Sequence, residues 1–130
     1  MSPIEATRCC VQALAQPAQA QLGLFPSFVL AGEEMALEFD DALRAFQEAA
    51  MPATEDQATC LTDLDRYLDQ LSTPANEEFW LEPSSLCSDP RWEKVRELAR
   101  AVLLAFGWPN ETPRRNGVTY VSGDTVVRNE

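Results

Sequence analysis

Apolar residues in this 130-residue chain recur at the 3.6-residue spacing of an α-helix over several long segments. The clearest stripe lies in residues 54–71 and consists of Cys60, Leu61, Leu64, Tyr67, Leu68 and Leu71. Comparable stripes lie in residues 3–16, 33–50 and 91–106. Because an amphipathic helix is stable when its apolar face is buried, the pattern predicts a mainly α fold, a compact single-domain bundle of four to five helices.

Capping residues support these helix boundaries. Start signals precede three of the helices: Ser2 with Glu5 and Thr54 with Gln57 as capping boxes, and Asp89 with Pro90 as an N-cap followed by a proline. Gly107 is expected to cap the last helix, and Pro109 prevents its continuation.

Shorter elements are expected between and after the long helices. The sequence predicts a short helix over residues 75–81, a loop over residues 82–88 and a short buried strand over residues 28–30. Residues 118–121 and 125–127, joined by a turn at residues 122–124, have the pattern of a small β-hairpin. The chain is therefore divided into a helical domain, residues 1–112, and a C-terminal hairpin or flexible tail, residues 113–130.

Positions on and off the stripes predict which side chains are buried. The side chains expected to be buried in the core are Phe46, Leu64, Leu68, Val102 and Phe106. Cys60 also lies on a stripe, so we expect a packed thiol with a raised pKa. Arg96 and Arg100 lie off their stripe, and we expect solvated i, i+3 ion pairs with Glu93 and Glu97.

Charge is concentrated in the middle of the chain. The net charge is −11, and residues 33–82 carry 14 acidic residues against two arginines, a net charge of −12. A surface of this kind repels nucleic acid and anionic membranes, and it speeds the encounter with a basic partner. We therefore expect a basic protein partner, no direct nucleic acid contact and no membrane contact.

Several kinds of chemistry are excluded by composition. The chain has no histidine, which removes Ser–His and Cys–His catalysis and His-ligated metal sites. The four cysteines lack the spacing of zinc ligands, and no glycine-rich phosphate loop occurs. We expect no catalytic residues, no metal site and no cofactor.

Glu5 stands where a signal peptide would be basic, which favours a cytoplasmic protein.

The two acidic helices predict one continuous acidic surface. If residues 33–50 and 54–71 form an antiparallel hairpin, their outward carboxylates lie side by side. We call this surface the acidic ridge, and it comprises Glu34, Glu38, Asp41, Glu48, Glu55, Asp56, Asp63 and Asp69. We expect the acidic ridge to bind the basic partner. A second candidate contact patch consists of Phe79, Trp80 and Trp108, because tryptophan is enriched in interface hot spots.

In size, charge and helical content the chain resembles bacterial immunity proteins. This resemblance implies a non-enzymatic, immunity-type inhibitor that neutralises a basic bacterial toxin by covering its active cleft. The chain is similar in the same respects to nucleic-acid-mimic inhibitors such as anti-CRISPR proteins, which block a nucleic-acid-processing enzyme. A third alternative is a Mg²⁺-dependent helical nucleotide pyrophosphohydrolase, because Glu38 and Asp41 fit the E-x-x-D half of its paired-carboxylate motif. The E-x-x-E half of that motif is missing from the chain.

Overall fold

The computed structural model describes residues 1–114, 118–122 and 125–129, with side chains described for residues 1–114. Within these residues the chain is mainly helical, with seven α-helices, one 3₁₀ helix and two strands. In chain order the elements are α1 (Pro3–Ala15), α2 (Ala18–Leu22), α3 (Ala31–Glu48), α4 (Glu55–Leu71), the 3₁₀ helix η1 (Pro74–Asn76), α5 (Glu77–Leu81), α6 (Ser85–Ser88), α7 (Pro90–Phe106), β1 (Val118–Ser122) and β2 (Thr125–Asn129).

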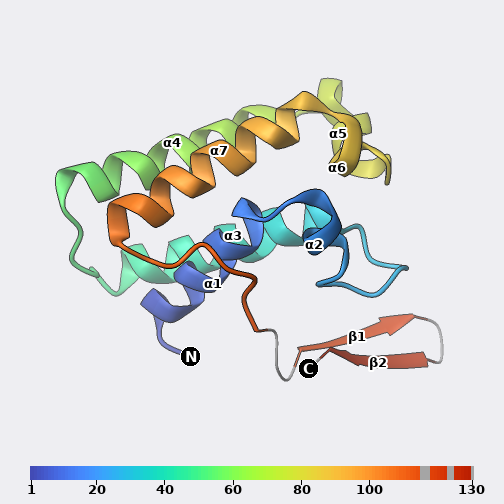
Figure 1. The fold of residues 1–130 in the computed structure, drawn as a ribbon, viewed down its shortest axis with the longest axis horizontal. Helices are drawn as coiled ribbons and strands as arrows, with labels where there is room; N and C mark the ends of the chain where they lie inside the picture. The colour runs from blue at the N-terminus through green and yellow to red at the C-terminus, as the bar shows by residue number, and fades with distance from the viewer. Residues whose placement is uncertain (115–117, 123–124, 130) are drawn as a thin grey trace.

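The four long helices form two layers (Figure 1). α4 and α7 run antiparallel and side by side in one layer, and α1 and α3 pack together in the other. α1 also packs against α7, which joins the two layers. The short helices α5 and α6 lie at one end of the bundle, beside the start of α7 (Figure 1).

The helices begin and end at the predicted capping residues, although only the Ser2 half of the capping box predicted at α1 is found among the described residues. The Glu5 N–H donates to Ser2 Oγ at 3.2 Å and starts α1. Thr54 and Gln57 form a reciprocal capping box at the start of α4, with bonds of 2.8 and 3.1 Å. Gly107 ends α7 with a φ of 69°, a left-handed conformation that glycine adopts without strain.

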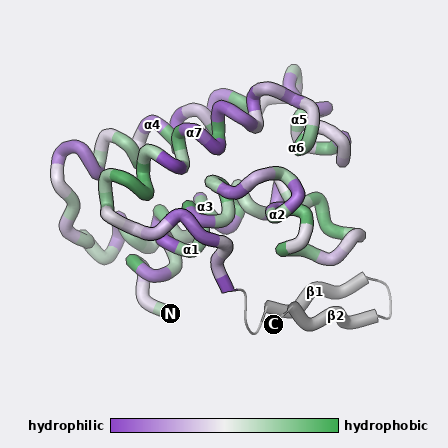
Figure 2. Tube along the Cα trace, viewed as in Figure 1, coloured by the Kyte–Doolittle hydropathy of each residue, from purple (hydrophilic) through white to green (hydrophobic). Residues whose placement is uncertain are grey.

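The core lies between the two layers of helices. Hydrophobic and hydrophilic residues alternate along each long helix in the manner of amphipathic helices (Figure 2). Four of the five expected core residues are buried: Phe46, Leu64, Leu68 and Val102. The expectation for Phe106 is wrong, because this ring is only half-buried. Phe106 is the last residue of α7, and its ring stacks on Trp108, with a centroid separation of 4.1 Å, at the edge of the core.

Arg96 is buried, which corrects the expectation that it is solvated. Its guanidinium donates to the side-chain oxygen of Gln21 at 2.9 and 3.1 Å and to the Leu86 carbonyl. Gln21 is itself fully buried, and its amide donates to the carbonyls of Ala13 and Leu14. This network links α1, α2, α6 and α7. Its hydrogen bonds replace those that the Arg96 guanidinium loses to water when it is buried.

An aromatic cluster closes the end of the bundle where α5 and α6 lie. The Trp92 ring is buried and stacks on Phe79, with centroids 4.6 Å apart. Trp92 Nε1 donates to Ser85 Oγ, whose hydroxyl donates in turn to the Phe79 carbonyl. Gly32 in α3 lies against the Trp92 ring, where a Cβ atom would overlap Cζ2. The close approach of α3 to the cluster therefore requires glycine at this position.

Two expectations for the connecting segments are wrong. Residues 28–30 form no strand, because the Val29 N–H donates to the Pro26 carbonyl in a turn, and Phe28 remains 42% exposed. Residues 82–88 contain the short helix α6 instead of an uninterrupted loop. Its last turn is closed by the Ser88 and Asp89 N–H groups, which donate to carbonyls one turn earlier.

The strands β1 and β2 pair with each other in antiparallel register. Val118 lies opposite Asn129, and Ser122 lies opposite Thr125. The turn expected at residues 122–124 falls mostly on residues 123 and 124, which lie outside the described residues.

Candidate functional site

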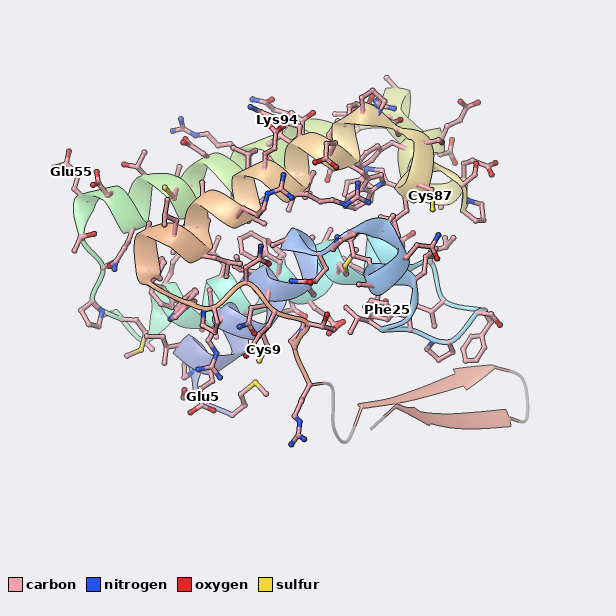
Figure 3. All side chains as sticks on the ribbon, in the orientation of Figure 1. Glu5, Cys9, Phe25, Glu55, Cys87 and Lys94 are labelled. Carbon is pink, nitrogen blue, oxygen red and sulfur yellow. The ribbon has the colours of Figure 1, made fainter. Side chains whose placement is uncertain are left out.

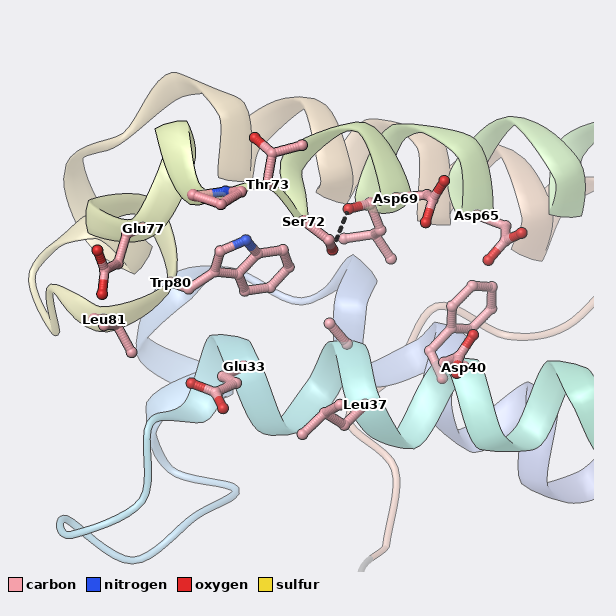
Figure 4. Close-up of a pocket in the computed structure, with 14 residues that line it drawn as sticks. Glu33, Leu37, Asp40, Asp65, Asp69, Ser72, Thr73, Glu77, Trp80 and Leu81 are labelled. Atoms are coloured by element: carbon pink, nitrogen blue, oxygen red, sulfur yellow. Dashed lines mark hydrogen bonds between the residues drawn. The ribbon is translucent and has the colours of Figure 1, made fainter.

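A groove runs between α3 and α4 and is closed at one end by α5 (Figure 4). Its volume is about 630 Å³, which is within the range of binding pockets in proteins. We call it the acidic groove, after the carboxylates that line it: Glu33, Asp40, Asp65, Asp69 and Glu77.

The floor and the closed end of the acidic groove are apolar. Phe39 and Leu68, both buried core residues, form part of its lining. Leu37 on α3 and Leu81 on α5 also line it, but they are 53% and 48% exposed. The groove therefore presents two leucine side chains to solvent although each could bury more apolar surface.

Trp80 forms the closed end of the acidic groove (Figure 4). Its Nε1 donates to the Leu71 carbonyl at 2.7 Å, which ties α5 to the end of α4. The ring meets Phe79 and Trp92 edge-on, with centroids 4.8 and 5.7 Å away. These contacts fix the indole in place, so the wall it forms is present before any partner binds.

The carboxylates come from three helices. Glu33 and Asp40 lie on α3, Asp65 and Asp69 on α4, and Glu77 begins α5 (Figure 4). Asp40 forms an exposed ion pair with Arg44 at 2.7 Å. Among the described residues no ion pair is found for the other four carboxylates: Glu33, Asp65, Asp69 and Glu77. The groove therefore carries uncompensated negative charge around an apolar floor.

Asp65 has a perturbed titration. Burial raises the pKa of its carboxyl above the ordinary aspartate value, and the negative charges of Asp40 and Asp69 raise that pKa further. A cation placed in the groove would favour the ionised form of Asp65 and offset this repulsion.

The acidic ridge predicted from the sequence is not one surface. Asp69 is the one predicted residue that lines the acidic groove. Glu38 and Asp41 lie on the other flank of α3, where they line a separate hollow beside Cys9 and Cys10 of α1. The predicted ridge therefore spans several faces of the protein.

The remaining ridge residues are distributed along the helices. Asp56 and Asp63 lie close enough to Cys60 to affect its titration. Burial raises the pKa of the Cys60 thiol, and the negative charges of Asp63 and Asp56 raise that pKa further. That raised pKa confirms the expectation for Cys60. Glu55 begins α4 and points away from the bundle (Figure 3). Glu34 is half-buried near the start of α3, and Glu48 is its exposed last residue.

Several groove residues were missed by sequence reasoning. Asp40, Asp65 and Glu33 carry the same charge pattern as the ridge residues, so charge alone did not separate the two flanks of each helix. Leu37 did carry a signal in the sequence, because it is an apolar residue that lies off the apolar stripe of α3. The structure leaves its side chain exposed. Of the second candidate patch, Trp80 lines the groove, Phe79 is buried behind it and Trp108 stacks on Phe106 elsewhere.

Three of the four basic residues of α7 form ion pairs: Arg91, Arg96 and Arg100. Glu93 pairs with Arg96 at 3.3 Å, as expected, and with Arg100 at 3.2 Å in place of the expected Glu97. Hydrogen bonds from Arg100 and Arg96 lower the pKa of Glu93. Arg91 pairs with Asp89 and lies over the Phe79 ring at 4.9 Å.

In residues 1–114 and the described strands, no group of three or more Cys, Asp or Glu side chains is placed to hold a metal ion. None of the described helices combines the length and apolar character that a membrane crossing requires. Comparisons with protein-family models, with curated proteins and with solved structures gave no significant match.

Proposed function

We propose that this chain is a non-enzymatic binding protein that captures a basic protein through the acidic groove. One observation carries the proposal: carboxylates from three helices surround an apolar floor, and four of them have no ion pair among the described residues. Lysine or arginine side chains would compensate this charge, and apolar side chains of the same partner would cover Leu37 and Leu81.

An immunity-type inhibitor of a basic bacterial toxin is the biological role that this chemistry supports best. Such an inhibitor needs fast, tight capture of a basic surface, and an acidic binding face accelerates the encounter. In this role the captured basic segment belongs to the toxin, and the body of the inhibitor then covers the toxin's active cleft.

The groove favours this role over a nucleic-acid mimic. A surface that imitates phosphates needs carboxylates without apolar surface between them, because a nucleic-acid-binding cleft is mainly polar and basic. The acidic groove instead combines carboxylates with two exposed leucines and the edge of an indole. This combination suits an amphipathic protein segment.

A site-specific photo-cross-linker tests the proposed function. The cross-linking amino acid is introduced at Leu37 in the groove and, as a matched control, at Leu104, an 85% exposed residue of α7 outside it. We expect Leu37, and not Leu104, to cross-link in the source cells to a lysine- or arginine-rich segment of one protein, identified by mass spectrometry. Co-expression of the native chain should then suppress the toxicity or activity of that protein.

Three outcomes would contradict the proposal. The first is a cross-linked segment that is acidic or uncharged. The second is equal cross-linking from Leu104, which would place the interface outside the groove. The third is an identified basic partner whose activity is unchanged by the native chain, which would remove the inhibitor role.

A further inference from the structure

The walls of the acidic groove are helices, and this limits what can lie between them. The backbone N–H and C=O groups within α3 and α4 are already paired along each helix. An extended segment lying in the groove would therefore find no backbone partners, in contrast to a strand added to the edge of a sheet. A helix needs no such partners, because its own backbone groups are paired internally.

The length of the groove matches two turns of a helix. The lining residues of α3 extend from Glu33 to Asp40, and those of α4 extend from Asp65 to Ser72. Each run covers a helical rise of about 10 Å. A third helix lying along this length presents apolar side chains at positions i, i+3 or i+4, and i+7 to the groove.

The carboxylates lie on both sides of the apolar floor. Asp40 and Glu33 are on the α3 side, and Asp65 and Asp69 are on the α4 side (Figure 4). An amphipathic helix with basic residues on both flanks of a narrow apolar stripe matches this arrangement. A small polycation would satisfy the carboxylates but leave Leu37 and Leu81 exposed to water.

From this geometry we infer that the acidic groove holds one amphipathic, basic α-helix of the partner protein, with an apolar side chain against Trp80. The inference rests on the proposed function and names the kind of segment that the groove accepts. The partner helix carries apolar residues at helical spacing and lysine or arginine on both flanks of that stripe.

A synthetic peptide tests this inference directly. The probe is a peptide of about 18 residues, made of leucine, alanine and lysine. A peptide of this length is partly helical in water on its own. Its leucines recur at i, i+4, i+7 and i+11, with lysines on both flanks. One control peptide has the same composition shuffled so that leucines surround the helix, and a second has a central proline that breaks the helix.

We expect the patterned peptide to bind at least tenfold more tightly than either control peptide in calorimetry, and to gain helical circular dichroism on binding. Leu37→Gln should weaken its binding at least fivefold. The matched variant Leu104→Gln, on α7 outside the groove, should leave binding unchanged. Both leucines are more than half exposed, so neither change removes core packing.

The outcomes separate this inference from the proposed function. In one outcome, all three peptides bind equally and are weakened alike by Asp65→Lys with Asp69→Lys. That result would overturn the inference that the groove holds a helix, and it would leave the proposed capture of a basic segment standing. Spermine binding as tightly as the patterned peptide would also overturn the helix. Peptide binding that ignores the charge of Asp65 and Asp69 would overturn the helix and the proposed function together.

Discussion

Asp65 on α4 and Asp40 on α3 bring two like charges to the same groove. Burial first, and then the charges of Asp40 and Asp69, raise the pKa of the Asp65 carboxyl. Ionised Asp65 therefore costs free energy in the folded state that it does not cost in the unfolded chain. This cost is the expected property of a site that is completed by a cationic partner.

Replacing Asp65 should make folding less sensitive to pH. Because the folded pKa of Asp65 is raised, the folded protein binds its proton more tightly, and stability is lost as pH rises through the ordinary aspartate range to the raised value. Asp65→Asn should remove this loss, so that it stabilises the protein at pH 7 and has little effect below the ordinary aspartate pKa. Urea unfolding from pH 3 to pH 7 measures the difference, with Asp63→Asn on the exposed face of α4 as the control. An equal gain from Asp63→Asn at every pH would contradict the account of Asp65.

The buried pair of Gln21 and Arg96 should be strongly coupled. Gln21→Leu removes the one oxygen that accepts two hydrogen bonds from the Arg96 guanidinium and should cost about 3 kcal/mol of unfolding free energy. Adding Arg96→Met removes the buried charge, so the double variant should lose less than the sum of the two single losses. A double-mutant cycle in urea provides the measurement, and additive losses would show that the network contributes no coupling.

Gly32 should tolerate no side chain. A Cβ atom at this position overlaps Cζ2 of the buried Trp92 ring and lies 3.0 Å from Cη2. Gly32→Ala should therefore cost about 1–3 kcal/mol in thermal or urea unfolding. Gly23→Ala is the matched control, because its Cβ would lie 3.5 Å from the nearest atom at an ordinary helical φ. Equal effects of the two changes would mean that α3 does not approach Trp92 as closely as described.

Ala50 provides a position where glycine should stabilise the protein. Its φ is 51°, a left-handed conformation, and the following Met51 N–H donates back to the Phe46 carbonyl to end α3. An L-residue in this conformation costs about 1 kcal/mol, so Ala50→Gly should raise the unfolding free energy by up to that amount. Ala49→Gly, at a right-handed position one residue earlier, should instead be neutral or destabilising. A loss of stability in Ala50→Gly would contradict this description of the helix end.

Local signals in the sequence were sufficient to predict the long helices. Thr54 and Gln57 cap α4, and Gly107 ends α7, because capping depends on residues within one turn. The burial of Phe46, Leu64 and Val102 was predicted correctly, because an apolar stripe identifies the face of a helix that packs into the core. Phe28 was wrongly placed in a buried strand, because a short apolar run carries no information about which partner it would need.

The site could not be predicted in the same way. Both flanks of α3 carry acidic residues, with Glu38 and Asp41 on one and Glu33 and Asp40 on the other. Which flank of α3 faces α4 depends on how α1 packs against α3 and against α7 across the two layers, and no local pattern encodes that rotation. Arg96 was misplaced for the same reason, since its acceptor Gln21 is 75 residues away in the chain.

The most direct test of the acidic groove is the affinity of the cross-linked partner, in purified form, for two charge-reversed variants. Asp65→Lys with Asp69→Lys reverses two groove carboxylates, and Glu48→Lys with Asp63→Lys makes the same change in net charge at two exposed residues outside the groove. Calorimetry at 0.15 M salt limits long-range effects, because the Debye length is then about 8 Å. The account predicts at least a tenfold loss of affinity for the groove pair, about 1.4 kcal/mol or more, and less than a threefold loss for the outside pair. Equal losses for the two variants, or no loss for the groove pair, would contradict it.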